Sequence, residues 1–172
     1  MTGRARRVEP RPGQESVWEY PRPPSVQRSD RHIEIRLGQE TILDTRRSWR
    51  VCETSHPPVY YAAPEDFAPG SLDFGAGASF CEFKGAATYW HLSGGGVRRD
   101  NAGWSYQDPT AAFHALRGAV AVYPGRMDVV LLDGEAVKPQ AGGFYGGWIT
   151  ADIVGPFKGE PETLGCNYPG GV

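Results

Sequence analysis

The sequence has few cysteines, no long apolar run and little net charge. Its three cysteines, Cys52, Cys81 and Cys166, are far apart in a chain of 172 residues. An odd number without a close pair argues against a disulfide framework, and without a Cys-x-x-Cys motif we expect no structural zinc or other metal site. No apolar run approaches the roughly 20 residues that span a bilayer. The formal net charge of −2 gives no bulk attraction to nucleic acid or acidic membranes, so neither is an expected partner.

The chain also lacks targeting and cofactor signatures. Residues 1–11 are basic, but no apolar stretch follows them, so they do not form a secretory signal. The run 94–96 is three glycines without the helix and Lys-Ser/Thr pair of a phosphate loop, and it is interpreted as a hairpin turn. Together with the cysteine content, these patterns predict a cytoplasmic protein that needs no cofactor.

Glycine and proline are abundant, with 23 and 15 residues, and they indicate many turns and short elements. The length suits one domain. We divide it into a Pro/Arg-rich arm (1–30), a β-rich domain (31–140) and a Gly/aromatic-rich C-terminal extension (141–172). Prolines favour extended backbone in the arm, which would either strap along the domain or bind a partner. The anchors of such a strap would be Val17, Trp18 and Tyr20.

Alternation of apolar and polar residues predicts a mainly β fold. The predicted strands are 32–37, 40–44, 48–53, 59–62, 87–92, 97–100, 119–123, 127–132 and 135–138. Residues 69–79 are predicted to be a loop because they are rich in Gly, Ser and Ala. Without βαβ alternation, the strands would form a single-domain antiparallel sheet that curls, as in a small barrel or sandwich, to protect its edges.

One short helix is expected beside these strands. Asp108 would cap its free amides and Pro109 would occupy its first position. Gly118 can adopt the left-handed conformation that ends a helix. A single helical turn is also predicted at 64–66.

Glu53 and His56 form one part of the candidate site. Both lie next to Pro57-Pro58, whose rigid backbone would hold the imidazole in place. A Glu–His pair could transfer protons, because histidine titrates near neutral pH. The alternative is a turn histidine bonded to a backbone carbonyl, with Glu53 paired to Arg47 or Arg50.

Cys81 and Lys84 form a second part. The Lys84 charge would favour the thiolate of Cys81, and with His56 as base the three would make a nucleophilic site. The alternative is that Cys81 is a small buried apolar residue and that the Lys84 side chain lies over an aromatic ring. The candidate catalytic residues are therefore His56, Glu53 and Cys81, and His32, His91 and His114 are expected to be structural or surface residues.

Aromatic residues are dense around these groups. Rings with polar tips build the walls of many small-molecule cavities, although alternation along strands would turn about half of them into the core. The candidate ligand-binding residues are Lys84, Tyr60, Tyr89, Trp104 and Tyr106.

Four ordered blocks between residues 31 and 138 carry a family resemblance. They are Glu53-Thr54-x-His56-Pro57-Pro58-x-Tyr60-Tyr61, Cys81-x-x-Lys84-Gly85-x-Ala87-x-Tyr89-Trp90, Ala102-x-Trp104-x-Tyr106-x-x-Pro109, and Ala121-x-Tyr123 before Asp133-Gly134. Together they resemble the DUF427 family. The resemblance implies a compact β-tent fold. Related β-tent families carry paired Cys-x-x-Cys zinc knuckles, which this sequence lacks. The family is sometimes labelled a nucleotidyltransferase, and no settled reaction comes with it.

Three functions follow as hypotheses. The first is the binding of a small organic ligand. If the protein is an enzyme, it would process this ligand by cofactor-independent acid–base or Cys-assisted chemistry. The second is a non-enzymatic interaction module, or a homo-oligomer, that uses the arm or the C-terminal extension. The third is nucleotidyl transfer, which needs two or three clustered carboxylates to hold magnesium; no Gly-Ser followed by Asp-x-Asp is present.

Overall fold

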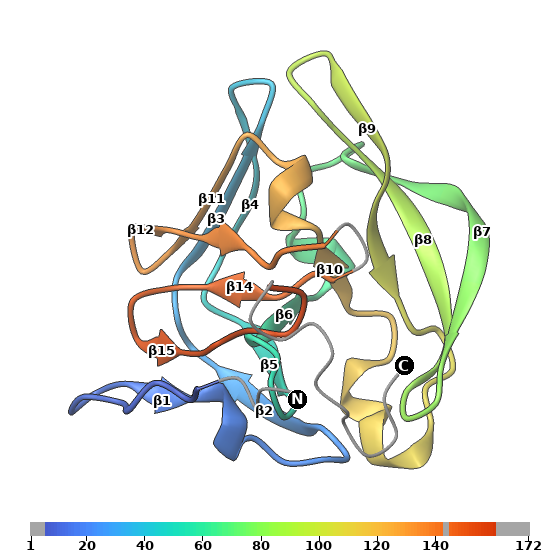
Figure 1. Cartoon of the computed structure of the whole chain (residues 1–172). Helices are drawn as coiled ribbons and strands as arrows, with labels where there is room; N and C mark the ends of the chain where they lie inside the picture. The colour runs from blue at the N-terminus through green and yellow to red at the C-terminus, as the bar shows by residue number, and fades with distance from the viewer. Residues whose placement is uncertain (1–5, 143–144, 161–172) are drawn as a thin grey trace.

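Almost all of the regular structure is β strand, as the sequence predicts. The computed structural model describes residues 6–142 and 145–160 (Figure 1). The strands are β1 (Glu15–Ser16), β2 (Ser25–Ser29), β3 (Ile33–Leu37), β4 (Glu40–Thr45), β5 (Ser48–Cys52), β6 (Val59–Ala62), β7 (Leu72–Cys81), β8 (Gly85–Gly94), β9 (Val97–Ser105), β10 (Val120–Val122), β11 (Val129–Leu132), β12 (Glu135–Ala136), β13 (Lys138–Pro139), β14 (Trp148–Ile149) and β15 (Ile153–Val154). Short 3-10 helices are η1 (Val17–Glu19), η2 (Pro64–Asp66), η3 (Ala111–Leu116) and η4 (Pro124–Arg126).

Two main sheets hold these strands. The larger has seven strands in the order β2-β5-β6-β10-β9-β8-β7, and the smaller has four in the order β12-β11-β3-β4. All the pairings within both sheets are antiparallel. Figure 1 shows the long strands β7, β8 and β9 on one side of the molecule and the smaller sheet on the other. The curled antiparallel architecture is confirmed, and the described strands do not close into a barrel.

The hairpins follow from the turn residues between them. β3 pairs with β4 across Gly38 and Gln39, which have φ values of 57° and 66°. Strand β3 buries alternate residues, as its apolar alternation predicts. The glycine run 94–96 turns β8 into β9, and the 3-10 turn at 64–66 is also confirmed.

The loop predicted over residues 69–79 is wrong in most of its length. Residues from Leu72 onward form β7, an edge strand that pairs with β8 from Leu72↔Leu92 to Cys81↔Gly85. Its register shifts between Phe74 and Ala78, where the glycines lie. Small residues gave this segment little intrinsic strand preference, and a ladder of distant pairs provides the stabilisation.

The predicted helix is shorter and differently capped. It is the 3-10 helix η3, its N-cap is Thr110 rather than Asp108, and Thr110 makes no side-chain capping bond. Non-helical angles at Phe113 interrupt it. The left-handed stop is confirmed, since Gly118 has a φ of 74°.

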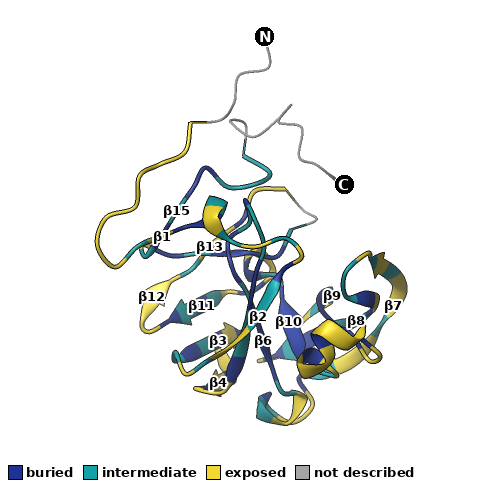
Figure 2. Ribbon diagram, turned by 90° about the horizontal axis from the view of Figure 1, so that it is seen from below, coloured by how far each residue is buried: buried dark blue, intermediate teal, exposed yellow. Residues whose placement is uncertain are grey.

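The seven-stranded sheet carries a hydrophobic cluster on each face. The first lies between this sheet and β3, β4 and β11, and it contains branched aliphatic residues such as Ile35 and Ile42. The second lies on the opposite face under η3, and it contains mostly rings and alanines. The central strands β6 and β10 are buried, whereas β12 is exposed (Figure 2).

The arm and the C-terminal extension pack on the domain and on each other. Glu15 and Ser16 of β1 pair in parallel with β15, and β2 is the edge strand beside β5. Val17 is fully buried, and the indole of Trp18 donates to the carbonyl of Pro156. Cys166 and Phe144 lie outside the described residues.

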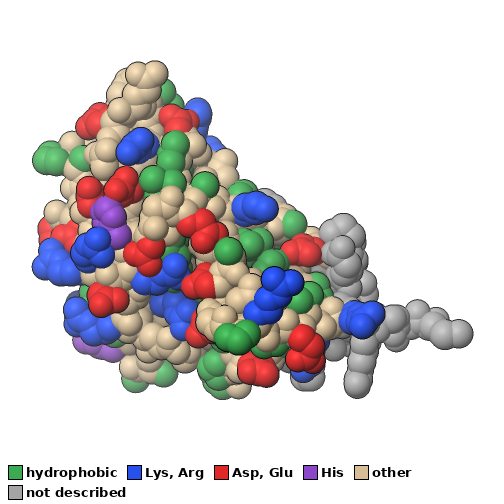
Figure 3. All heavy atoms as spheres, turned by 90° about the vertical axis from the view of Figure 1, so that its left-hand side faces the viewer, with side chains coloured by type: hydrophobic (Ala, Val, Ile, Leu, Met, Phe, Trp, Pro, Cys, Tyr) green, Lys and Arg blue, Asp and Glu red, His purple; other side chains and the backbone are tan. Residues whose placement is uncertain are grey.

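Charges of both signs are interspersed on the face that Figure 3 shows, which agrees with the small net charge. None of the described helical segments has the length and apolar character needed to cross a membrane.

Candidate functional site

A cavity of about 410 Å³ opens on the aromatic face of the seven-stranded sheet. Its wall comes from β5, β6, β7, β8 and β9, the turn after β7, the arm and the start of the extension. The lining residues are Arg22, Val51, Glu53, His56, Pro57, Val59, Tyr61, Ser79, Phe80, Cys81, Glu82, Phe83, Lys84, Ala87, Tyr89, Trp104, Tyr106, Tyr123, Gln140, Tyr145 and Gly146. Seven of the eight residues predicted for the site therefore surround one cavity.

The segment between β5 and β6 carries Glu53 and His56 into this cavity. Its backbone is held from both sides: Ser55 N–H donates to the carbonyl of Val17 in the arm, and Lys158 N–H donates to the carbonyl of Ser55. Ser55 has a φ of 73°, which turns the chain sharply before the two prolines. The arm and the C-terminal extension thus hold the segment that carries the histidine.

His56 is a half-buried group that is neutral near pH 7, with 21% of its side-chain surface exposed. Its Nε2 lies 3.7 Å from Glu53 Oε2, and its ring packs edge-on to Tyr145 with 5.4 Å between centroids. Burial is the largest cause that lowers the pKa of His56 to about 4. Nearby positive charges act in the same direction; they belong to Lys158, Lys84 and Arg22. The alternative partners of Glu53 are occupied elsewhere, since Arg50 pairs with Glu15 and Arg47 with Asp66.

The aromatic wall is internally hydrogen-bonded. Trp104 Nε1 donates to the hydroxyl of Tyr61 at 3.2 Å, and the Tyr89 hydroxyl donates to Ser79 Oγ at 2.8 Å. Trp104 also packs on Tyr123 at 4.6 Å between ring centroids. Burial raises the pKa values of Tyr61, Tyr106 and Tyr123 above the ordinary value, so these phenols are uncharged.

Cys81 and Lys84 line the cavity at the end of β7 and in the turn that follows. Among the described residues, no hydrogen bond joins Cys81 to His56. Lys84 Nζ lies 5.8 Å from the ring centre of Tyr106 and 5.9 Å from that of Phe113, as the ring-covering alternative predicts. The structure brings the thiol, the imidazole and the ammonium to one cavity without linking them into a nucleophilic site.

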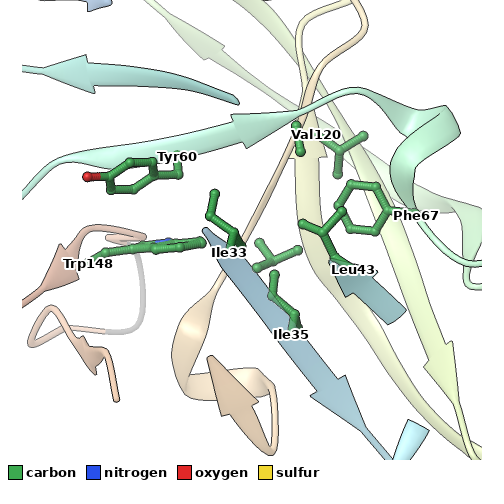
Figure 4. Close-up of a pocket in the computed structure, with 9 residues that line it drawn as sticks. Ile33, Ile35, Leu43, Tyr60, Phe67, Val120 and Trp148 are labelled. Carbon is green, nitrogen blue, oxygen red and sulfur yellow. The ribbon is translucent and has the colours of Figure 1, made fainter. Parts of the chain in front are cut away.

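Tyr60 does not line this cavity. It is 3% exposed and packs against Trp148 with 4.9 Å between ring centroids, on the opposite face of the sheet (Figure 4). The neighbouring residue, Tyr61, lines the cavity in place of the predicted Tyr60. Successive side chains of a strand point to opposite faces, so a choice between two adjacent tyrosines needs the tertiary structure.

Fourteen further residues line the cavity and were absent from the predicted set. Four of them with polar side chains are Arg22, Tyr61, Gln140 and Tyr145. Alternation along residues 59–62 places Tyr61 on the same face as Val59. This pattern would have identified Tyr61 if the face of the strand that borders the cavity had been known. Arg22 and Gln140 carry no such signal, because their positions depend on the paths of the arm and the extension.

One group of side chains with metal-ligating atoms occurs in the described residues. It consists of His32 just before β3, Glu34 on β3 and Asp44 on β4. His32 Nε2 lies 2.7 Å from Asp44 Oδ1. None of the three lines the aromatic cavity.

Comparison with known proteins supports the resemblance of the four blocks. The family model described as Domain of unknown function (DUF427) matches residues 25–133, from β2 to the turn after β11. A comparison with curated proteins found no match. Since the matched residues form more than half of the 172-residue chain, the protein belongs to the DUF427 family.

Proposed function

We propose that the protein binds a small, planar organic molecule in the aromatic cavity. The observation that carries the proposal is the cavity of about 410 Å³ between Tyr61, Trp104 and Tyr106, with ionisable groups gathered along its wall. An apolar wall with a few polar groups is typical of small-molecule sites of roughly 300–1,000 Å³. Ring faces favour a flat ligand because stacking adds to area burial.

The wall supplies both polar and apolar contacts. His56 and Glu53 come from the segment between β5 and β6, and Lys84 comes from the turn after β7. Phe80, 78% exposed, stands at the outer edge. A ligand of this kind would stack on rings inside the cavity and pair with charged groups near the opening.

The first experiment is native mass spectrometry of the purified protein, compared with its denatured mass. A reproducible extra mass that leaves on denaturation is the expected result. Binding of planar aromatic compounds is then measured by thermal shift and NMR. If neither a bound mass nor a binding compound is found, the proposal fails.

A pair of neighbouring alanines locates the binding. Ala87 is 5% exposed and lines the cavity, whereas Ala86, the preceding residue of β8, is exposed. We expect Ala87→Leu to fill part of the cavity and abolish binding, and Ala86→Leu to leave it unchanged. Equal binding by both variants would place the ligand elsewhere.

Nucleotidyl transfer remains a second candidate because the matching family model bears a label for that activity. The carboxylates that line the cavity are Glu53 and Glu82. The proposal predicts stabilisation by a nucleoside triphosphate only when magnesium is present. A thermal shift that is the same with and without magnesium would contradict it.

The interaction-module hypothesis needs a different test from simple deletion of residues 1–30. That deletion would remove β2, an edge strand of the main sheet, and Arg22, part of the cavity wall. Charge reversal at the exposed residues of the arm, such as Arg11→Glu, changes its surface without removing the strand. An altered native mass or oligomeric state would support the hypothesis, and an unchanged one would contradict it.

A further inference from the structure

Gln140 connects His56 to the C-terminal extension. The residue follows β13, is 5% exposed and makes three polar contacts through its side-chain amide. Its Oε1 accepts from Gly147 N–H at 3.1 Å. Its Nε2 donates to the carbonyl of Lys158 at 2.7 Å and lies 3.2 Å from His56 Nδ1.

These partners determine which way the amide points. A backbone N–H can only donate and a backbone carbonyl can only accept, so the atoms facing Gly147 and Lys158 are the oxygen and the nitrogen of Gln140 respectively. An amide nitrogen has two hydrogens. One goes to Lys158, and the other points at His56 Nδ1, which must therefore accept.

The acceptor role of Nδ1 places the ring hydrogen of His56 on Nε2. A neutral imidazole has one N–H, so a ring that accepts at one nitrogen donates at the other. The nearest carboxylate oxygen, Glu53 Oε2, is 3.7 Å from Nε2, which is beyond hydrogen-bond distance. The Nε2–H is thus open to a ligand at the wall of the cavity.

The surroundings favour this neutral form. Tyr145 packs on the ring, and the burial of His56 makes the imidazolium unfavourable. Charges near the ring come from several elements: the Glu53 carboxylate lies 3.7 Å from Nε2, and cations on three other segments help to lower the pKa of His56. These cations are Lys84 after β7, Lys158 in the extension and Arg22 in the arm.

We propose that Gln140 is a positioning residue that holds His56 as a neutral hydrogen-bond donor, and that the cavity therefore takes a planar carboxylate. The Nε2–H of His56 donates to a ligand oxygen, and the ring does not act as a proton acceptor in the free protein. This proposal rests on the proposed function of the cavity, and it adds the chemical class of the ligand.

Lys84 gives the preference for a charged oxygen over a neutral one. In residues 6–142 and 145–160, Lys84 forms no salt bridge, and its Nζ lies over the rings of Tyr106 and Phe113. A partly buried cation that has no carboxylate within ion-pair distance is stabilised when a ligand supplies one. The donor and the cation line the same cavity, so one anionic ligand can meet both.

The tautomer is tested without any ligand, by heteronuclear NMR of the histidine ring nitrogens. We expect His56 to carry its hydrogen on Nε2 as a single neutral form down to about pH 5. Gln140→Met removes the amide and should produce a mixture of tautomers. Gln107→Met, at an exposed glutamine that donates to Ser105, is the matched control and should leave His56 unchanged. A wild-type ring with hydrogen on Nδ1, or one that titrates near its ordinary pKa, would overturn the role of Gln140.

The ligand class is tested with benzoate, benzamide and benzylamine as probes of matched shape. We expect benzoate to bind the wild-type protein about tenfold more tightly than benzamide, and both to bind more tightly than the cationic benzylamine. The affinity of the wild-type protein for benzoate should be constant from about pH 8 to pH 5.5, because His56 does not titrate in this range. An affinity that rises about tenfold through the ordinary histidine range would identify a cationic His56 and overturn the proposal.

The two measurements separate the failures. If none of the probes binds while His56 has the predicted tautomer, the ligand class falls and Gln140 keeps its positioning role. If benzylamine binds most tightly, the cavity selects cations and the proposal is wrong although the proposed function stands.

Discussion

The two faces of the seven-stranded sheet are built from different side chains, and they differ in how closely those side chains pack. The face toward β3 and β4 is filled by branched aliphatic residues around Tyr60 and Trp148, with no room for a water molecule (Figure 4). The opposite face carries Tyr61, Trp104 and Tyr106 around about 410 Å³ of space. The same strands thus support a core on one side and a cavity on the other.

The largest expected loss of stability comes from a substitution on the face toward β3 and β4, which we call the filled face. Trp148 is 2% exposed and packs on Tyr60, so Trp148→Ala should lower the free energy of unfolding by ~3–5 kcal/mol. Tyr89→Ala, on the cavity wall, should cost clearly less because its ring already lacks contacts on one side. Urea denaturation of both variants measures the difference. Equal losses would mean that the two faces are packed alike.

The fold and many of the residues that line the cavity could be predicted from the sequence, but the face on which each residue lies could not. Alternation in β3 identified its buried residues, and the position of His56 and Glu53 beside two prolines identified the segment that enters the cavity. Tyr60 was placed on the wrong face because its strand has adjacent tyrosines and alternation alone does not say which one faces the cavity.

Residues whose roles depend on distant pairing were the hardest to predict. Strand β7 is rich in glycine and alanine, and its ladder with β8 rather than its own composition makes it a strand. Gln140 reaches His56 only because the extension returns to the segment between β5 and β6. Contacts between residues 84 positions apart leave no local pattern in a single sequence.

The second prediction uses the titration of His56 on the cavity face. Its pKa is about 4 in the folded protein and 6.5 ordinarily, so between these values the unfolded chain binds more protons than the folded chain. Stability should therefore fall as the pH is lowered through this window, by up to about 3 kcal/mol from this group. His56→Gln should remove that component from the pH dependence of urea unfolding.

His114→Gln is the matched control, because His114 is exposed on η3. It should keep the pH dependence of the wild-type protein. If the free energy of unfolding of His56→Gln depends on pH as in the wild-type protein, burial does not hold the imidazole neutral. The two faces of the sheet would then not differ in this property.

A third prediction concerns the closeness of the extension to the aromatic wall. A Cβ at Gly146 would overlap the ring of Trp104, so Gly146→Ala should force that ring to move, cost ~1–3 kcal/mol and weaken ligand binding. At Gly125 a Cβ would meet Pro139 at 3.5 Å, an ordinary contact, and Gly125→Ala should be tolerated. Tryptophan fluorescence and urea denaturation distinguish the two. An unperturbed Gly146→Ala variant would contradict the packing of the extension on the cavity.

The smallest expected effect tests whether the aromatic wall is held by hydrogen bonds or by ring packing. Tyr61 is 2% exposed and accepts from Trp104 Nε1, so Tyr61→Phe leaves a buried indole N–H without its partner and should cost ~1–2 kcal/mol. Tyr123 packs on the same indole, and its hydroxyl forms no hydrogen bond within the described parts of the chain, so Tyr123→Phe should be nearly neutral. Urea denaturation of both variants compares them. If both lose the same stability, ring contacts alone hold Trp104, and the open face is maintained by packing in the same way as the filled one.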